Sequence, residues 1–368
     1  GEVVEIPFSA ADRFKPGGDV LDVRPHGNGN IHDTFLVSLD FPETRCFILQ
    51  RVNTRVFGRP ELVTANIRTL TDHVGKRLER EAPNSRQRWE IPRILPDREG
   101  SDHWIAPDGS FWRAMSFIES ARSFETVQGA EHALEVGYGL GTFHRLIHDL
   151  PAERLADTLR GFHVTPHYLQ RFESVLAARP PGLSPEIRYA LKFVEDRKAG
   201  VGVLEDARTR NRLRLRPIHG DPKVDNILID PETAQAVAMI DLDTVKPGLI
   251  HTDIGDCLRS CCNPSGEETQ DWEAVRFEPD LCRSILQGYL STAGGFLTAD
   301  DHDFLYDAVR LIPFELGLRF LTDHMEGDVY FKVRYPGHNL VRALVQFKLT
   351  ESIESLSGPL RAVLRELR

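Results

Sequence analysis

The chain has 368 residues and a formal net charge of −10, and 41% of its residues are hydrophobic. This length exceeds what one hydrophobic core usually organises, so we expect two lobes with a cleft between them. The negative charge disfavours nucleic acid as a partner, and no run of residues is apolar enough to suggest a membrane span. The N-terminal residues lack the pattern of a secretory signal, so the expected location is the cytoplasm.

The cysteines form an odd set of five without a Cys-x-x-Cys pair: Cys46, Cys257, Cys261, Cys262 and Cys282. This pattern is atypical of a disulfide framework or a zinc site. We therefore expect free thiols, and because unpaired cysteine is among the most buried residue types, we expect them in the core.

The first part of the chain favours strands. Apolar runs at residues 20–24 and 34–39 flank a turn-forming segment, and a third run occupies residues 46–52. The turn contains Gly27, Asn28, Gly29 and Asn30, whose backbone amides are expected to cover nucleotide phosphates. An ordinary hairpin turn would have the same composition.

A predicted helix follows, because apolar residues recur every three or four positions between residues 60 and 79. Two more strands are expected near residues 104–106 and 111–118, separated by a turn. The end of the last strand resembles a hinge between lobes. There the backbone groups of Ser116, Phe117 and Ile118 are expected to bind the adenine edge of a nucleotide.

After this point the pattern becomes mainly helical. Helices are expected at residues 131–149, 168–178, 271–290, 300–323 and 340–356, with one hairpin formed by residues 226–229 and 236–240. The segment Gly137-Tyr138-Gly139-Leu140-Gly141 is similar to a dinucleotide-binding fingerprint, but that motif requires a preceding strand. Since a helix-forming stretch precedes it here, we expect these glycines to allow close helix packing.

The segment His219-Gly220-Asp221-Pro222-Lys223-Val224-Asp225-Asn226 leads into the hairpin, which ends at Ile240-Asp241-Leu242-Asp243. This order matches the H-x-D-x-x-x-x-N motif of protein kinases followed by the aspartate of their D-F-G motif. In that chemistry the first aspartate accepts the proton of a substrate hydroxyl, and Mg²⁺ takes oxygen ligands from the asparagine and the second aspartate. We therefore predict Asp221 as catalytic base, Asn226 and Asp241 as metal ligands, and ATP and Mg²⁺ as cofactors.

Two charged neighbours extend this site. Lys223 is placed to meet the γ-phosphate and is assigned with Asp221 to catalysis, although a solvated surface lysine would fit the sequence equally well. Asp243 is expected to contact the substrate or to support the metal site.

These elements predict an α+β, two-lobed protein-kinase-like fold. A small N-terminal lobe, residues 1–118, would hold an antiparallel sheet with one helix and bind the nucleotide. A larger, mainly helical C-terminal lobe, residues 119–368, would carry the catalytic and acceptor-binding residues.

Segments outside the catalytic motif carry a family resemblance: Asn28-Gly29-Asn30-Ile31-His32-Asp33-Thr34-Phe35, Phe47-Ile48-Leu49-Gln50-Arg51-Val52-Asn53, Asp241-Leu242-Asp243-Thr244-Val245, Arg319-Phe320-Leu321-Thr322-Asp323 and Gly337-His338-Asn339-Leu340. Over nearly its whole length the chain resembles the aminoglycoside phosphotransferase superfamily, and within it the bacterial N-acetylhexosamine 1-kinases. The resemblance implies a small-molecule kinase that phosphorylates the anomeric hydroxyl of a sugar.

The resemblance also implicates Arg319 and Tyr330 as sugar contacts. An arginine inside the apolar run of residues 311–321 would be costly unless it were paired or faced a polar cleft. An ion pair with Glu315 or Asp323 would explain it equally well.

The third strand departs from the protein-kinase pattern, because Gln50-Arg51 replaces the phosphate-binding lysine. Arg51 is permanently charged and is expected to clamp phosphates, with Glu61 as one candidate to orient it. His32 and Asp33 are expected to reach phosphate or sugar, with strand-edge contacts as the alternative.

Two other functions remain open from the sequence. The acceptor could be cationic, such as an aminoglycoside or choline, although Arg319, Lys332 and Arg334 argue against a uniformly anionic acceptor pocket. A nucleotide-binding pseudokinase is disfavoured by the intact catalytic motif. The sequence does not specify which sugar is bound, or the oligomeric state.

Overall fold

The N-terminal lobe is a six-stranded sheet in which every strand pair is antiparallel. The computed structural model of the chain describes residues 2–27, 31–81 and 88–368, so Asn28, Gly29 and Asn30 of the expected phosphate loop lie outside the described residues. The strand order is β1-β2-β3-β6-β4, with β5 paired to β6. The strands are β1 (Asp19–Pro25), β2 (Asp33–Asp40), β3 (Cys46–Val52), β4 (Ile94–Leu95), β5 (Trp104–Ile105) and β6 (Phe111–Ser116).

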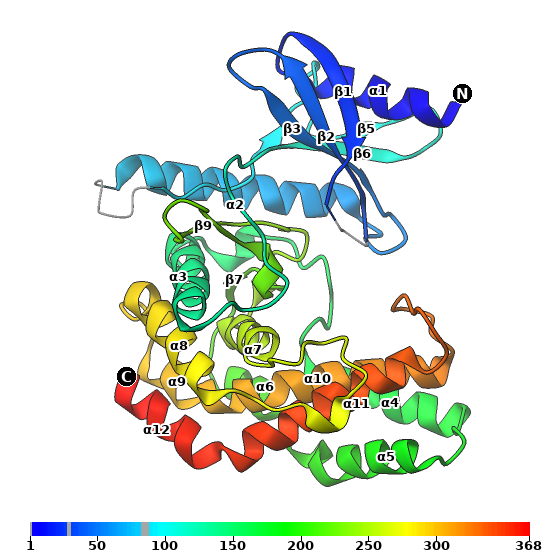
Figure 1. Ribbon diagram of the computed structural model, residues 1–368, viewed down its shortest axis with the longest axis vertical. Helices are drawn as coiled ribbons and strands as arrows, with labels where there is room; N and C mark the ends of the chain where they lie inside the picture. The colour runs from blue at the N-terminus through cyan, green and yellow to red at the C-terminus, as the bar shows by residue number, and fades with distance from the viewer. Residues whose placement is uncertain (1, 28–30, 82–87) are drawn as a thin grey trace.

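Two helices accompany this sheet, one more than the sequence predicted. The unexpected helix is α1 (Glu2–Phe14), which has Pro7 inside it, and proline usually argues against a helix interior. Its Phe14 packs with Phe47 and Trp112 in a separate core of the lobe. The expected helix, α2 (Pro60–Arg80), runs between the sheet and the rest of the molecule (Figure 1).

The C-terminal part is mainly helical and larger, as predicted (Figure 1). Its helices are α3 (Ala130–Ile147), α4 (Thr165–Ala178), α5 (Pro185–Arg197), α6 (Val203–Thr209), α7 (Ile250–Cys261), α8 (Pro279–Ala293), α9 (Ala299–Asp303), α10 (Leu305–Glu326), α11 (His338–Ser355) and α12 (Ser357–Leu367). Its short strands are β7 (Arg216–Ile218), β8 (Ile227–Ile229), β9 (Ala236–Met239) and β10 (Lys246–Gly248). None of the helices within the described residues is long and apolar enough to span a membrane.

Several boundaries differ from the expected ones. Helices α5, α6, α7 and α12 and strands β4, β7 and β10 were not predicted, and the helix expected at residues 271–290 begins only at Pro279. Proline suits the first turn of a helix but not its interior, which explains the later start. The lobe boundary at residue 118 remains our proposal, consistent with the end of β6 at Ser116.

Helix α2 is fixed to the C-terminal lobe rather than to the sheet alone. Its buried Ile67 and Leu70 share one hydrophobic core with Leu140 of α3. The buried Asn66 side chain donates to the Ala156 carbonyl at 2.8 Å and accepts from the Ala156 N–H at 2.8 Å. Because a buried amide without partners would be costly, these bonds set the position of α2 against the larger lobe.

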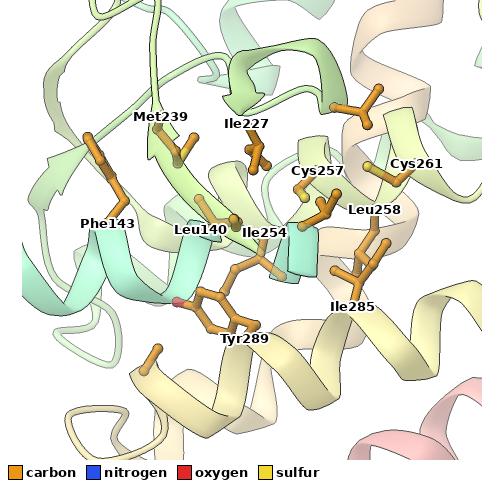
Figure 2. Close-up of a cluster of buried hydrophobic side chains, with 14 of the residues drawn as sticks. Leu140, Phe143, Ile227, Met239, Ile254, Cys257, Leu258, Cys261, Ile285 and Tyr289 are labelled. Carbon is orange, nitrogen blue, oxygen red and sulfur yellow. The ribbon is translucent and has the colours of Figure 1, made fainter. Parts of the chain in front are cut away.

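The β8–β9 hairpin rests on a core formed by α3, α7 and α8. Figure 2 shows the apolar side chains that meet beneath it, including Leu140, Ile227, Met239, Ile254 and Ile285. Burial of five such side chains is worth roughly 1.5–3 kcal/mol each. The packed core therefore holds the hairpin rigidly, and it also fixes the positions of the loops at both ends of the hairpin.

All five cysteines are free thiols, and all but Cys46 are buried. Cys257 and Cys261 lie in the same core (Figure 2). Burial holds the pKa of the Cys262 thiol well above its ordinary value, so this group stays a protonated, apolar side chain.

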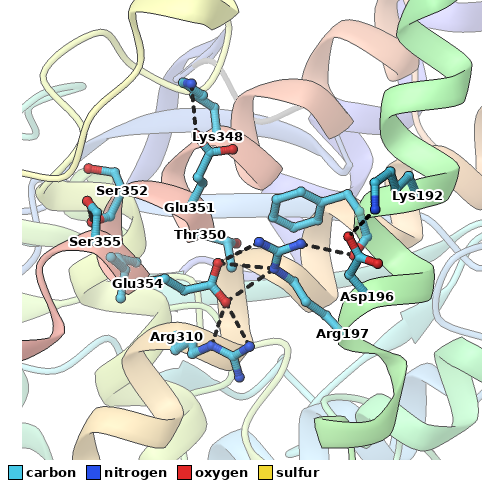
Figure 3. Close-up of polar contacts among 12 residues, drawn as sticks. Lys192, Asp196, Arg197, Arg310, Lys348, Thr350, Glu351, Ser352, Glu354 and Ser355 are labelled. Carbon is cyan, nitrogen blue, oxygen red and sulfur yellow. Dashed lines mark hydrogen bonds and ion pairs between the residues drawn. The ribbon is translucent and has the colours of Figure 1, made fainter.

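The base of the C-terminal lobe is tied by an ion-pair network on its surface. Glu354 of α11 pairs with Arg197 of α5 at 2.7 Å and with Arg310 of α10 at 2.7 Å (Figure 3). The side chains are partly exposed, so each pair contributes modestly. Together these ion pairs fix the positions of α5, α10 and α11 relative to one another.

Two of the three glycines of α3, Gly137 and Gly141, pack against α8, as predicted, whereas Gly139 packs against Ile227 of β8 and Ala236 of β9. Gly137, Gly139 and Gly141 are buried within α3. A β-carbon at Gly137 would overlap the carbonyl oxygen of Ile285, and one at Gly288 of α8 would overlap the carbonyl oxygen of Leu134. These glycines therefore let two helix backbones touch.

Replacing Gly137 by Ala should lower the free energy of unfolding by about 1–3 kcal/mol or more, because α8 must move away. The matched control is Gly358→Ala in α12, where an added β-carbon meets no atom within 4 Å. Urea unfolding of both variants measures the difference. Equal midpoints for Gly137→Ala and the unchanged chain would contradict close helix packing.

Candidate active site

The catalytic loop is anchored by a buried carboxylate on α7. Asp253 accepts hydrogen bonds from the His219 N–H at 2.8 Å and from the Gly220 N–H at 2.9 Å. It also contacts the ring of the buried His144 at 2.8 Å. Because burial alone would raise its pKa, these donors must outweigh burial, and the pKa of Asp253 lies below its ordinary value. The sequence analysis missed this residue, which no part of the catalytic motif marks.

His219 connects the loop to the end of the hairpin. The Asp221 N–H donates to Nδ1 of His219 at 3.1 Å, so the other ring nitrogen, Nε2, carries the hydrogen and donates to the Ile240 carbonyl at 2.9 Å. The Thr244 hydroxyl donates to the His219 carbonyl at 2.8 Å. The residues on both sides of Asp241 are thus tied to the loop that carries Asp221.

The three residues predicted for catalysis and metal binding are brought together. Asn226 is buried, and its Nδ2 donates to the Asp221 carbonyl at 2.8 Å, which reserves its amide oxygen for another partner. The Asn226 carbonyl accepts from the Ile240 N–H at 2.9 Å, next to Asp241. Asp241 has a φ of 62°, a region that non-glycine residues rarely adopt and that often marks functional sites.

The carboxylates repel one another. Burial, followed by the charges of Asp243 and Asp221, raises the pKa of Asp241 well above its ordinary value. Burial also raises the pKa of Asp221, against the opposing charge of Lys223, whose Nζ lies 3.9 Å from its carboxylate. A bound cation would keep Asp241 ionised. Asp241 and the amide oxygen of Asn226 are oxygen ligands that suit Mg²⁺, which usually completes its shell with phosphate and water.

Asp243 is engaged with the N-terminal lobe. Its carboxylate lies 3.1 Å from Nε2 of His32 and 2.6 Å from Nη2 of Arg113. Burial opposes its ionisation, but Arg113 and His32 more than offset this, so the pKa of Asp243 falls below its ordinary range. His32 also accepts from the Asn53 N–H at 3.0 Å. His32 and Asp243 therefore connect the two lobes, and their expected roles toward substrate or metal remain predictions.

Arg51 and Asp33 lie apart from this cluster. Arg51 pairs opposite Trp112 in the sheet, and its guanidinium lies 5.8 Å from the centre of the Trp112 ring. Its Nε donates to Asp33 at 2.8 Å, and both side chains are largely exposed. Because successive strand residues face opposite sides, Arg51 points away from the face that carries Gln50. The expected roles of Arg51 on phosphates and Asp33 on substrate are therefore corrected, and Asp33, not Glu61, orients Arg51.

The segment expected to bind adenine differs from residue to residue in its contacts within the protein. The Ser116 N–H donates to the Arg93 carbonyl at 2.8 Å, so this group is not available to an adenine ring. The Phe117 ring stands edge-on to the His26 ring, with centroids 5.6 Å apart, beside the described end of the β1–β2 loop. Ile118 belongs to a small buried cluster with Leu228. Phe117 and Ile118 remain the residues we expect to border adenine.

The acceptor side centres on Arg319 of α10. Its guanidinium lies 5.0–5.7 Å from the centres of four aromatic rings, those of Phe162, Tyr168, Tyr330 and Phe331. Burial acts against the charge of Arg319, but the surrounding groups, Tyr168 first, raise its pKa. Tyr330, which is 67% exposed, lies beside Arg319, and the role of both residues as sugar contacts remains a prediction.

His163 joins this region to the catalytic loop. One ring nitrogen lies 2.7 Å from the Glu315 carboxylate, and the other lies 3.1 Å from the Gly220 carbonyl. Since both partners are acceptors, the ring donates from both nitrogens, and Glu315 raises the pKa of His163 despite its burial. Glu315 therefore pairs with His163, and the alternative of an Arg319–Glu315 ion pair is not realised.

Two segments quoted for the family resemblance meet at Asp323. Its carboxylate accepts from the backbone N–H groups of Val329, Tyr330 and Phe331 at 2.8–2.9 Å and from Nδ2 of Asn339 at 2.9 Å. Asp323 and Asn339 are buried. Their contact fixes the loop that presents Tyr330 to Arg319.

A two-lobed fold that places an aspartate, an asparagine and a second aspartate on one loop and hairpin is the arrangement of a phosphotransferase. The model of the phosphotransferase enzyme family, APH, matches residues 22–283, and the chain belongs to that family.

Solved structures show the same fold at low sequence identity. An aminoglycoside phosphotransferase from Alicyclobacillus acidocaldarius is 15% identical with a TM-score of 0.65, and the match covers 98% of this chain and 97% of that one. The microcompartment-associated aminopropanol kinase is 17% identical with a TM-score of 0.60, covering 96% and 98%. The GDP complex of aminoglycoside 2′-phosphotransferase-IIIa is 13% identical with a TM-score of 0.57, covering 92% and 96%.

Asp253→Ala should lower the free energy of unfolding by about 3 kcal/mol, because it leaves buried donors unpaired. It should also lower phosphotransfer turnover of the folded protein by about 100-fold, since the loop loses its alignment. The matched control is Asp97→Ala: Asp97 is also buried and accepts from two backbone N–H groups and Arg13, but in the N-terminal lobe. Equal turnover losses in the two variants would refute the anchoring role.

Proposed function

We propose that this chain is an ATP- and Mg²⁺-dependent small-molecule kinase that phosphorylates the anomeric hydroxyl of an N-acetylhexosamine or a related sugar. The observation that carries the proposal is the joining of Asp221, Asn226 and Asp241 by the hydrogen bonds of the catalytic loop and the hairpin. A single aspartate or asparagine in a turn would carry no such meaning, but their convergence matches the parts of a phosphoryl-transfer site.

In the proposed reaction, the acceptor hydroxyl lies against Asp221, which takes its proton as the bond between the acceptor oxygen and the γ-phosphorus forms. The bond from that phosphorus to the bridging oxygen breaks, and its electron pair leaves with ADP. The raised pKa of Asp221 favours proton uptake. Mg²⁺, when held by Asn226, Asp241 and the phosphates, neutralises charge on the transferring group. Lys223 lies beside Asp221 and would support the same charge.

The nucleotide would occupy the side of the cleft next to the hinge. Phe117 and Ile118 would border adenine, and the β1–β2 loop that begins at Gly27 would cover the phosphates. The GDP found in the aminoglycoside 2′-phosphotransferase-IIIa complex supports nucleotide binding by this fold. The choice of ATP rests on the family resemblance.

The sugar proposal rests on the acceptor side. The guanidinium of Arg319, held among aromatic rings, would donate hydrogen bonds to sugar hydroxyls, and Tyr330 would contact the ring. The guanidinium of Arg319 already makes the cation–π contacts that these aromatic rings offer. The rings are therefore not free to bind a quaternary ammonium acceptor such as choline. Asp323 and Asn339 come from two segments that carry the family resemblance, and their hydrogen bond holds the loop that places Tyr330 beside Arg319.

The direct test is Mg²⁺-dependent ADP formation with free hexoses, N-acetylhexosamines, aminoglycosides and choline. We expect the highest kcat/KM with a free N-acetylhexosamine or a related hexose. The matching methyl glycoside should be inert, because its anomeric oxygen has no proton for Asp221 to accept. Equal turnover of the methyl glycoside would place transfer at another hydroxyl and refute the 1-kinase assignment.

Arg319→Ala should lower kcat/KM for the sugar by about 30-fold or more, equivalent to the roughly 2–5 kcal/mol lost on removing one partner of a buried charged contact. ATP affinity should stay nearly constant, because Arg319 lies on the acceptor side. Arg171→Ala is the control, since Arg171 is exposed and pairs with Glu326 on the surface. An unchanged kcat/KM in Arg319→Ala would remove the residue from the acceptor site.

A further inference from the structure

The face of the N-terminal sheet that is turned to the catalytic hairpin carries a buried arginine that the sequence analysis did not consider. Arg113 lies on β6 directly opposite Gln50 of β3. Residues opposite each other in an antiparallel pair share a face, so Arg113 and Gln50 point to one side while Arg51 and Trp112 point to the other. The ion pair with Asp243, two residues from Asp241, shows that the Arg113 face is turned to the catalytic hairpin.

The guanidinium of Arg113 is only partly satisfied. The residue is 1% exposed, and its Nε and Nη2 donate to Oε1 of Gln50 at 3.0 and 2.8 Å. Nη2 also lies 2.6 Å from Asp243. Its remaining nitrogen, Nη1, is buried and has no hydrogen-bond partner among the described residues. A buried N–H group of a charged side chain that lacks a partner is rare in proteins and calls for an explanation such as a ligand.

We propose that Arg113 is the cation through which the N-terminal sheet binds the phosphates of the nucleotide, with Nη1 donating to a phosphate oxygen. The inference rests on the proposed kinase function. It fits the composition of the third strand, where position 50 is an uncharged glutamine and Arg51 faces away from the cleft. Gln50 and Asp243 hold the planar guanidinium, so one edge of it is oriented before the anion arrives.

The experiment compares Asp243→Asn with the double variant Arg113→Gln/Asp243→Asn in the full chain. Removing Arg113 alone would leave the Asp243 carboxylate buried without its cation, whereas the double variant removes both charges. Calorimetry measures the Kd of Mg-ATP and of adenosine, which lacks phosphates. We expect the Kd of Mg-ATP to be at least about 10-fold higher in the double variant than in Asp243→Asn, because a hydrogen bond from a guanidinium to a phosphate is stronger than one between neutral groups. The Kd of adenosine should be equal in the two.

Arg51→Gln is the matched control, because it removes an arginine from the adjacent strand on the opposite face, and its Kd for Mg-ATP should equal that of the unchanged chain. Equal Kd values for Mg-ATP in Asp243→Asn and the double variant would overturn the assignment. So would a parallel loss of adenosine binding, which would show a structural role. If the unchanged chain binds no Mg-ATP, the proposed kinase function itself fails, which is a different result.

Discussion

Three carboxylates, those of Asp221, Asp241 and Asp243, lie close together where the catalytic loop meets the end of the hairpin, and neighbouring groups offset their mutual repulsion. Lys223 lies against Asp221, while Arg113 forms an ion pair with Asp243 and His32 donates a hydrogen bond to it. Asp241 is left between them with a pKa well above its ordinary value. Such crowding of carboxylates costs stability, and the proposed binding of a cation and phosphates at this site would account for it.

The rigid parts of the fold keep this arrangement in place. The hairpin stands on the core of α3, α7 and α8, where glycines bring α3 and α8 into backbone contact. From α7, Asp253 holds the catalytic loop by its amides, and from α10, Glu315 reaches the same loop through His163. The strained backbone of Asp241 is then maintained by its neighbours.

Local patterns were enough to predict much of this. All strands of the first lobe except β4, helix α2, the hairpin and the glycine packing follow from periodicity and turn residues, and the spacing of Asp221, Asn226 and Asp241 predicted their convergence. What local patterns could not supply is which residues face one another across the fold. Arg51 and Arg113 are both arginines on strands, and only the pairing of β3 with β6 and the contact with Asp243 decide which one faces the catalytic hairpin. Asp253 was not predicted for the same reason, since its hydrogen-bond partners His219 and Gly220 lie more than thirty residues away in the chain.

The most direct test of the central claim, that Asp221 is the base of a phosphotransferase site, is the Kd of Mg-ATP for Asp221→Asn measured beside its turnover. The account predicts a turnover loss of about 100-fold or more with Mg-ATP affinity nearly unchanged, because the base acts on the acceptor and does not hold the metal. Near-normal turnover in Asp221→Asn would contradict the account.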